Sequence, residues 1–342
     1  MSIALNQQNK QLVWNLWHAL ENAPDDQCLA IARQAMTEAM VWHGFDPINQ
    51  LQGVEAFVNA FWLPLRHSFP DLKRQTHIFL GGESNGRVDD NLALDGKWWV
   101  SGTGYLSGTF ARDYLTIPAT GRPVNIRWGE FCRLEAGQMV ESYFLLDLID
   151  LMQQAGYHVL PPSLGQDGLY PPPAAGDGVL LDPQDPQITA YSRDHLRRFL
   201  FEGLNKYDQR NLQSMGMVNF FHTDVQWYGP GGIGACLNLK EFEDFHQRPW
   251  LIAYPNRQVQ DLTALFAEGY YSGAPGWAGV KATHTGPYLD APATGNAIVF
   301  NGLDWWKRVG EQYVENWVFV DMLHLFRQFG IDLLARLAEQ KP

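Results

Sequence analysis

The sequence predicts an α+β protein made of two tandem cone-shaped domains, each a curved antiparallel sheet covered by N-terminal helices. The chain has 342 residues, a length that corresponds to two domains of ordinary size. Residues 159–186 form a Pro- and Gly-rich stretch, which excludes helix and central strand. The segments on either side of this stretch repeat one another, and each has helical patterns first and strand patterns afterwards.

The repeat has two registers, each constant over a long stretch of sequence. Early in each half, the pairs share one offset: Trp42 with Trp227, Phe57 with Phe242, and Phe69-Pro70 with Tyr254-Pro255. Later, the pairs share a second offset: 118–121 with 292–295, Val140-Glu141 with Val314-Glu315, and Asp147 with Asp321. Because one register over a long stretch rarely arises by chance, the sequence indicates an internal duplication.

We therefore predict a first domain at residues 1–158, a linker at 159–186 and a second domain at 187–342. In each domain a first helix (8–19; 193–204) and a second helix (26–39; 209–220) precede a strand that ends at 42–43 or 227–228. A third helix follows at 54–65, or after a predicted N-cap at Asn238. Strands then follow, with turns at 81–82, 121–122 and 295–296, a last strand (140–146; 314–320) and a short terminal helix.

Composition excludes several classes of function. The net charge of −12 argues against a nucleic-acid partner and against attachment to anionic membrane, because both need a cationic face. The cysteines Cys28, Cys132 and Cys236 are few and far apart, which argues against a disulfide framework. The N-terminus is typical of an amphipathic helix rather than a signal peptide, and no window has the length of a membrane span. We expect a cytoplasmic protein.

Other motifs give little support to cofactor or metal chemistry. The segment 229–234 matches GxGxxG, but the βαβ context that a dinucleotide site requires is missing. We interpret this segment as a loop at the mouth of a pocket. There is no HExxH motif, no pair of histidines at metal spacing and no Cys/His cluster. We therefore expect no metal and no cofactor.

Four segments in the second half carry a family resemblance: 283–286 (THTG), 292–295 (PATG), 314–321 (VENWVFVD) and 326–330 (FRQFG). Together they resemble the SnoaL-like polyketide cyclase (ester cyclase) family. The likeness covers most of residues 190–332 and returns more loosely over residues 8–157. The resemblance implies the nuclear transport factor 2-like cone, a cystatin-like roll, with a pocket on the concave face of the sheet. It also implies ring closure by an intramolecular aldol step without metal or cofactor, and an acid/base carboxylate at the end of the last strand.

That carboxylate corresponds to Asp321, with Asp147 as its repeat partner. Alternation along the strand places Asp321 on the same face as Trp317 and Phe319. Burial beside aromatic rings raises the pKa of a carboxyl group towards neutrality, which suits a general base. Both aspartates also directly precede a helical segment, where aspartate is a favoured N-cap. Catalysis and capping both stay open.

His284 is a second candidate for the catalytic site. Alternation along its strand places it on one face with Ala282 and Gly286, which leaves room for a ligand. A His and an Asp in one pocket can divide the acid and base roles. The alternative is a core histidine bonded to the backbone. When Ser107-Gly108 is aligned with Thr285-Gly286, Leu106 stands opposite His284, so we expect the second domain to be the active one.

Aromatic residues are the candidate pocket walls, with core packing as the alternative for each. The candidates for substrate binding are Trp227, Tyr228, Trp317, Trp42, His43, Tyr143 and the polar Asn301. Asn301 aligns with Arg127, and Asp304 aligns with Glu130; each can reach a carbonyl or hydroxyl of a ligand, unless it lies on a surface strand. The aromatic excess favours a flat or apolar substrate.

These observations predict an enzyme whose pocket Asp, with His, is the general acid/base on a small carbonyl or ester substrate. The reaction is a cyclisation, isomerisation or aldol-type step, or hydrolysis of a small ester. The alternative is a non-catalytic small-molecule binder of the same fold. The family fold often dimerises through its open sheet face, so we expect the two domains to form an internal pseudo-dimer; a further homo-oligomer stays open.

Overall fold

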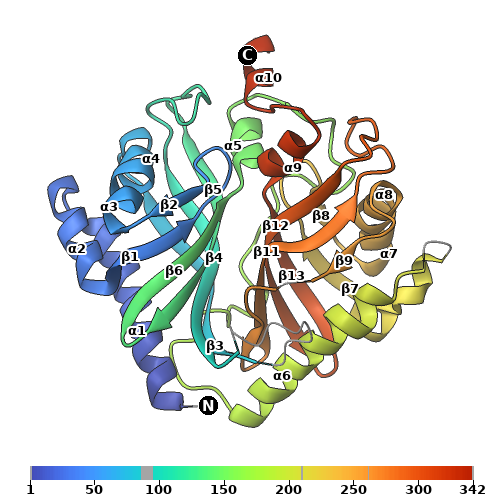
Figure 1. Cartoon of the computed structure of the whole chain (residues 1–342), viewed down its shortest axis with the longest axis horizontal. Helices are drawn as coiled ribbons and strands as arrows, with labels where there is room; N and C mark the ends of the chain where they lie inside the picture. The colour runs from blue at the N-terminus through green and yellow to red at the C-terminus, as the bar shows by residue number, and fades with distance from the viewer. Residues whose placement is uncertain (1, 86–94, 209–210, 261, 341–342) are drawn as a thin grey trace.

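The computed structural model describes residues 2–85, 95–208, 211–260 and 262–340, and its strands form two sheets (Figure 1). The first copy comprises α1 (Ile3–Asn22), α2 (Cys28–Ala35), β1 (Met36–His43), β2 (Gln50–Gln52), α3 (Val54–Phe57), α4 (Leu63–Ser68), β3 (Lys73–Ser84), β4 (Lys97–Thr109), β5 (Pro123–Glu135), β6 (Gln138–Leu146) and α5 (Leu148–Gln154). The strand order is β2-β1-β6-β5-β4-β3.

The second copy repeats this plan with a longer helical entry. It comprises α6 (Pro186–Arg198), β7 (Phe221–Tyr228), β8 (Ala235–Cys236), α7 (Leu239–Glu241), α8 (Arg248–Ala253), β9 (Gln258–Val259), β10 (Phe266–Glu268), β11 (Tyr271–Thr283), β12 (Ala297–Val309), β13 (Gln312–Val320), α9 (Met322–Gln328) and α10 (Ala335–Glu339). The strand order is β10-β11-β12-β13-β7-β8, and β9 pairs with β11. The α+β class and the tandem arrangement are as predicted.

The sheets are mixed rather than wholly antiparallel. In each copy the first strand runs parallel to the last: β1 pairs with β6, and β7 pairs with β13. After β1 the chain passes through α3 and α4 before it enters β3, so the sheet begins again at its far edge and β6 returns beside β1. Only these pairs depart from the antiparallel prediction among the described strand pairs.

Three predicted elements differ in the structure. The helix predicted at 26–39 ends at Ala35, because the extended strand β1 begins at Met36. In place of a helix at 209–220, the described residues form the short 3₁₀ turns Leu212–Met215 and Met217–Asn219, which meet at the left-handed Gly216. The turn predicted at Gly81-Gly82 lies inside β3.

Gly82 serves close packing between the copies instead of a turn. A Cβ atom at this position would lie 2.9 Å from the carbonyl oxygen of Ala267, which belongs to β10 of the second copy. Real Cβ atoms do not approach a backbone oxygen this closely, so glycine allows β3 and β10 to come together. The glycine pair therefore marks a contact between domains.

The two sheets pack face to face at the centre of the molecule, and the helices α2, α3, α4, α7 and α8 lie on the outer sides (Figure 1). Across this contact the ring of Phe131 stacks on Trp305, with 4.8 Å between centroids. The indole nitrogen of Trp305 also donates a hydrogen bond of 2.8 Å to Oγ of Ser101. Each domain thus uses one sheet face for its own helices and the other for its partner domain.

The linker is irregular, as its Pro and Gly content predicts, and it contacts both copies. Phe79 of the first copy forms a β-bridge with Val179. In the second copy, Trp317 donates through its indole nitrogen to the carbonyl oxygen of Pro171 at 2.8 Å, and Glu315 accepts a hydrogen bond from the backbone of Ala174. The linker therefore covers part of the inner face of the second sheet.

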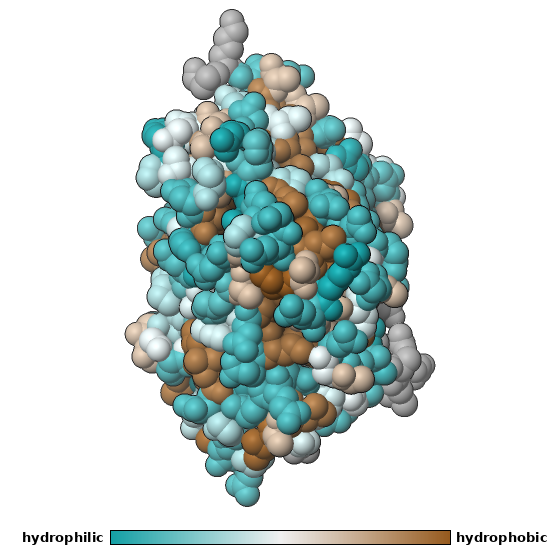
Figure 2. Space-filling view, turned by 90° about the vertical axis from the view of Figure 1, so that its left-hand side faces the viewer, coloured by the Kyte–Doolittle hydropathy of each residue, from teal (hydrophilic) through white to brown (hydrophobic). Residues whose placement is uncertain are grey.

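Figure 2 shows the outer face of the first copy, where hydrophilic residues surround smaller brown patches. A shallow groove between α1 and α2 is lined by Leu12, Leu16 and Ile31 together with several glutamines. Within the described ranges, no helix has both the length and the apolar character that crossing a bilayer requires. The three cysteines are buried and free.

Candidate functional site

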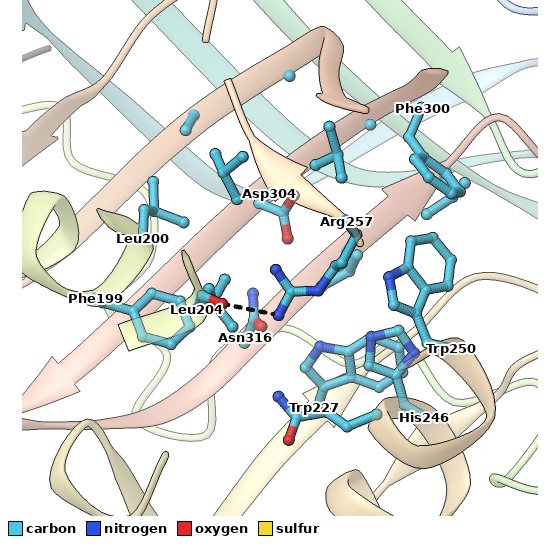
Figure 3. A pocket seen from close by; sticks show the side chains of 18 of the residues that line it. Phe199, Leu200, Leu204, Trp227, His246, Trp250, Arg257, Phe300, Asp304 and Asn316 are labelled. Atoms are coloured by element: carbon cyan, nitrogen blue, oxygen red, sulfur yellow. Dashed lines mark hydrogen bonds between the residues drawn. The ribbon is translucent and has the colours of Figure 1, made fainter. Parts of the chain in front are cut away.

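A cavity of about 160 Å³ lies in the second copy, between its sheet and its helices. A cavity of this order holds one aromatic ring. Aromatic and aliphatic side chains form most of the wall, and the polar groups converge from separate elements (Figure 3). The polar and aromatic lining residues discussed below are Trp227, His246, Gln247, Trp250, Arg257, Phe300, Asp304, Trp306 and Asn316.

The equivalent space in the first copy is filled. Only about 10 Å³ remains there, and the guanidinium of Arg74 lies 4.0 Å from the ring centroid of Trp128 and 4.6 Å from that of Trp17. The strand registers give the residues that replace these large side chains in the second copy: Arg74 corresponds to Val259, Trp128 to Gly302 and Phe144 to Val318. Smaller side chains at equivalent positions therefore open the cavity.

Asp304 is the acidic group of the cavity. It lies on β12, and alternation along this strand places it on the same face as Gly302 and Trp306, which also line the cavity. Burial raises the pKa of Asp304 to about 8, and a hydrogen bond from Asn316 lowers it in part. Near neutral pH this carboxyl group exists in both protonation states, so it can donate or accept a proton.

His246 provides a neutral imidazole on the opposite wall. It belongs to the π-helical segment Phe242–Gln247, and its ring stacks on Trp227 with 4.2 Å between centroids. Burial lowers the pKa of His246 to about 3, and the charge of Arg257 lowers it further. Three buried polar atoms of the lining have no hydrogen-bond partner within the described residues: His246 Nδ1, Gln247 Oε1 and Trp306 Nε1. Such atoms are available to a polar ligand or to water.

Arg257 is the cation of the cavity and precedes β9. Its Nη2 donates to the carbonyl oxygen of Leu204 at 3.1 Å and contacts Sδ of Met215 at 3.0 Å. Burial lowers the pKa of Arg257 to about 10, so the guanidinium stays charged at neutral pH. Figure 3 shows this guanidinium, from the segment before β9, and the carboxyl group of Asp304, from β12, pointing toward one another.

Asp321 and Asp147 cap helices and tie the copies together. Asp321 accepts hydrogen bonds from the backbone N–H of His324 in its own copy, at 3.1 Å, and of Asp46 in the other copy, at 2.8 Å. Asp147 accepts from Asp150 at 3.0 Å and from Gly231 of the other copy at 2.8 Å. Burial raises the pKa of Asp321 to about 7. Neither carboxylate belongs to the described lining of the cavity.

His284 is fully buried and also lies outside that lining. Its Nδ1 lies 3.1 Å from Oγ1 of Thr294, and its ring stacks on Phe329 at 4.0 Å. The strand register corrects the alignment of this residue. His284 pairs with Asn296 through the same backbone bonds that join Phe110 to Arg122, so its counterpart in the first copy is Phe110 rather than Leu106.

Of the residues predicted to bind substrate, the structure places Trp227 in the cavity wall. Trp42 stacks on Phe61 in the filled core of the first copy, with 4.4 Å between centroids. Asn301 accepts a hydrogen bond from the backbone of Ala278, which stabilises a bulge in β11. These two residues therefore have structural contacts away from the cavity.

The remaining predicted residues lie on the inner faces of the sheets. His43 stacks on Tyr143 at 4.3 Å, and both rings pack against Trp277 of the second copy. Tyr228 packs beside Trp317, whose indole nitrogen is bound to the linker. The loop at 229–234 also lies between the copies rather than at the cavity, because its backbone bonds to Asp147 and Arg127.

Sequence reasoning did not single out Arg257, His246, Gln247 or Asn316, and it named Asp304 only through its alignment with Glu130. The repeat itself held the missing signal. At some equivalent positions one copy has a large side chain and the other a small one. These positions indicate where the space between sheet and helices is filled in one domain and open in the other. Applied to Trp128 and Gly302, this comparison points to the second copy and to the face of β12 that carries Asp304.

The fold and the cavity define a tandem protein of the nuclear transport factor 2-like class with one open domain among the residues described. The family model for SnoaL-like polyketide cyclase matches residues 15–155 and 196–329, one segment in each copy. The chain therefore belongs to the SnoaL-like polyketide cyclase family. The described residues include no group of three or more His, Cys, Asp or Glu side chains that could hold a metal ion.

Solved structures similar to this chain have the length of a single copy. A putative SnoaL-like polyketide cyclase from Jannaschia sp. CCS1 is 22% identical, with a TM-score of 0.34, and the match covers 46% of this chain and 95% of that one. The putative polyketide cyclase IdmH from Streptomyces antibioticus is 18% identical, with a TM-score of 0.33 and coverage of 44% and 99%. An NTF2-like protein from Burkholderia thailandensis E264 is 20% identical, with a TM-score of 0.29 and coverage of 44% and 97%. Comparison with curated proteins finds no match.

Proposed function

We propose that the second copy is an acid/base enzyme of the cyclase or isomerase type, with Asp304 as the group that transfers the proton. The observation that carries this proposal is the position of Asp304, a carboxyl group of raised pKa in the wall of an aromatic cavity. A pKa near the working pH is the property that a general acid/base needs. The family supports a reaction of this type, and the fold alone does not specify one.

The reaction class is proton transfer at a carbon next to a carbonyl group. With a pKa of about 8, about one tenth of the Asp304 side chains are ionised at pH 7. The carboxylate removes the proton from the substrate carbon, and the resulting carboxylic acid returns it to another carbon in an isomerisation. In a cyclisation the carbanion attacks a second carbonyl, and the acid protonates the new alkoxide. Asn316 and the unpartnered atoms of His246 and Trp306 are positioned to contact polar substrate atoms.

The first copy acts in this proposal as a scaffold. Its own cavity is filled by Arg74 and tryptophan rings, and its sheet supports the inner face of the second sheet through Phe131 and Trp305. Asp321 contributes through capping and through its bond to Asp46. We therefore propose Asp304, rather than the pair of Asp321 and His284, as the acid/base centre.

Deuterium exchange tests the proposal without a known substrate. Small cyclic ketones, including cyclohexanone-2-carboxylate, are incubated with the full chain in D₂O, and exchange at the carbon next to the carbonyl is followed by NMR. Asp304→Asn is expected to lower the exchange rate by about 10² to 10⁴, the usual contribution of a general acid/base. Asp321→Asn is the matched control and is expected to change the rate less than about tenfold if it folds.

Two results would overturn this assignment. If Asp304→Asn exchanges protons as fast as the wild type, Asp304 is not the acid/base group. If the wild type binds these ketones but never exchanges their protons, the second copy is a binding protein of the same fold. Loss of exchange in Asp321→Asn, with unchanged circular dichroism and unchanged exchange in Asp304→Asn, would return the role to Asp321.

A further inference from the structure

We infer that Arg257 recognises a carboxylate on the substrate, so that the cavity takes a small ring compound with one negative charge. This inference rests on the proposed function, because it concerns the same cavity. It adds the charge and size of the substrate and identifies the residue that selects them. The observations that carry it are the charge balance, the free donors of Arg257 and the dimensions of the cavity.

The charge balance of the cavity is positive. Among the described lining residues, the ionisable groups are Arg257, His246 and Asp304. The pKa of Arg257 is about 10 and that of His246 about 3, so the first is charged and the second neutral at pH 7. The carboxyl group of Asp304, with a pKa of about 8, is mostly neutral. A buried positive charge without a counter-ion is costly, and a monoanionic ligand would provide that counter-ion.

Other buried cations of the chain have a partner of another kind. Lys10 forms an ion pair with Glu268 at 2.6 Å, and Arg127 forms ion pairs with Asp147 and Asp150. Arg74 instead has its guanidinium over the rings of Trp17 and Trp128, which fill the space around it. Arg257, only 8% exposed, forms no ion pair with any residue that the structure describes, and it borders the open cavity.

The position of Arg257 is fixed before any ligand arrives. Its Nη2 is held by the carbonyl oxygen of Leu204 and by Met215. Asn205 joins the same helical segment to β9 through two hydrogen bonds with the backbone of Val259, at 2.9 and 2.8 Å. Within the described residues, Nη1 and Nε of Arg257 have no hydrogen-bond partner. Each of these two free donors can give one charge-assisted hydrogen bond to a carboxylate oxygen.

The dimensions of the cavity set the rest of the ligand. A volume of about 160 Å³ accommodates one ring with a small substituent. With its carboxylate on Arg257, the ring would lie among Trp227, Trp250 and Phe300, which lie on one side of the guanidinium in Figure 3. Because the guanidinium of Arg257 and the carboxyl group of Asp304 point toward one another in Figure 3, the end of the ring that carries the carboxylate would lie nearest to Asp304. The substrate class is a six-membered aromatic or alicyclic monocarboxylate whose carbonyl group lies near the acid.

Benzoate and benzamide provide the direct test, because they share size and shape and differ in charge. Binding of each to the full chain at pH 7 is measured by isothermal titration calorimetry. The wild type is expected to bind benzoate at least tenfold more tightly than benzamide. Arg257→Gln is expected to abolish this preference and to leave benzamide binding within about threefold of the wild type. Arg248→Gln, which removes an exposed arginine of the same copy, is the charge-matched control and should keep the preference.

The outcomes separate this inference from the proposed function. Equal binding of benzoate and benzamide by the wild type, or an unchanged preference in a folded Arg257→Gln variant, overturns the carboxylate inference. Loss of ketone exchange in Asp304→Asn would still support the acid/base proposal in that case. A benzoate preference in a wild type that exchanges no ketone protons would keep the role of Arg257 and refute the proposed chemistry.

Arg257→Lys covers the case in which Arg257→Gln does not fold. Lysine keeps the charge but not the fixed planar group of donors, so benzoate should still bind more tightly than benzamide, with a preference reduced by about threefold to tenfold. A folded Arg257→Lys variant that binds benzamide more tightly than benzoate would contradict the inference. A wild type that binds the two compounds equally would contradict it just as directly.

Discussion

Asp321 is buried and Asp304 is partly buried, and desolvation raises the pKa of both, to about 7 and about 8. Their surroundings give them different roles. Asp321 accepts hydrogen bonds from two backbone N–H groups. These bonds stabilise its ionised form and fix the start of α9 and the segment at Asp46. Asp304 has Asn316 as its one stabilising side chain among those described, and it borders open space. Raised pKa alone does not identify a catalytic residue; access to a ligand distinguishes the two.

At the scale of this single residue, the stability of the protein should depend on pH. The pKa of Asp304 is raised from 3.8 to about 8, so the folded state keeps a proton that the unfolded chain has lost. Stability therefore falls as pH rises from about 4 to about 8. Asp304→Asn removes this titration. One pKa unit corresponds to about 1.4 kcal/mol. Between pH 5 and pH 8.5, the free energy of unfolding of the variant should therefore rise by at least about 1 kcal/mol relative to that of the wild type.

Thermal unfolding of both proteins across this pH range gives the measurement. A gain of this size corresponds to a relative increase in Tm of about 2–4 °C for domains of this length. Asp321 titrates in the same direction, so the double variant Asp304→Asn/Asp321→Asn should have the flattest profile. Parallel Tm profiles for the wild type and Asp304→Asn would show that Asp304 is ionised in the folded protein throughout.

At the scale of the elements, the alternation of side chains along a strand determines which residues share a face. It does not determine which face turns toward the helices. The sequence correctly groups Trp317 and Phe319 on one face of β13, and Asp321 follows the strand as the N-cap of α9. The structure turns Asn316, Val318 and Val320 of that strand toward the cavity. Both faces of β13 carry large apolar residues because one packs on helices and the other on the linker and the partner domain. A single hydrophobic pattern could not separate these two environments.

The cavity therefore depends on side-chain size at a few positions of β12, β13 and β9. Val318→Phe introduces the residue that the first copy has at the equivalent position, Phe144. The larger ring is expected to occupy the cavity and to weaken benzoate binding at least tenfold, while the Tm stays within a few degrees because the ring fills existing space. Calorimetry and thermal unfolding measure the two effects. Val309→Phe, at an exposed site of β12, is the control. Unchanged benzoate binding in Val318→Phe would place the ligand site elsewhere.

At the scale of the whole molecule, the duplication and the general order of helices before strands in each copy could be predicted from the sequence, although short 3₁₀ turns replace the helix predicted at 209–220 in its described part. The contact between the copies could not, because it joins residues that are far apart in the chain. Gly82 against Ala267, Phe131 on Trp305 and the loop at 229–234 on Asp147 are all such contacts. Residues that appeared to be pocket walls or turns serve this interface.

The two capping aspartates should contribute unequally to that interface. Asp147 lies 3.3 Å from Nη1 of the buried Arg127, so its removal leaves part of a buried cation uncompensated. At the position equivalent to Arg127, the second copy has the neutral Asn301. Burial disfavours the ionised form of Asp321 and raises its pKa to about 7.

Asp147→Asn should therefore lower the free energy of unfolding at pH 8 by about 2 kcal/mol or more, whereas Asp321→Asn should change it by less than about 1 kcal/mol, because the neutral amide keeps an acceptor and avoids a buried charge. Urea unfolding at pH 8, followed by tryptophan fluorescence, measures both. A larger loss for Asp321→Asn would mean that its charge, rather than its hydrogen-bonding geometry, holds the two copies together.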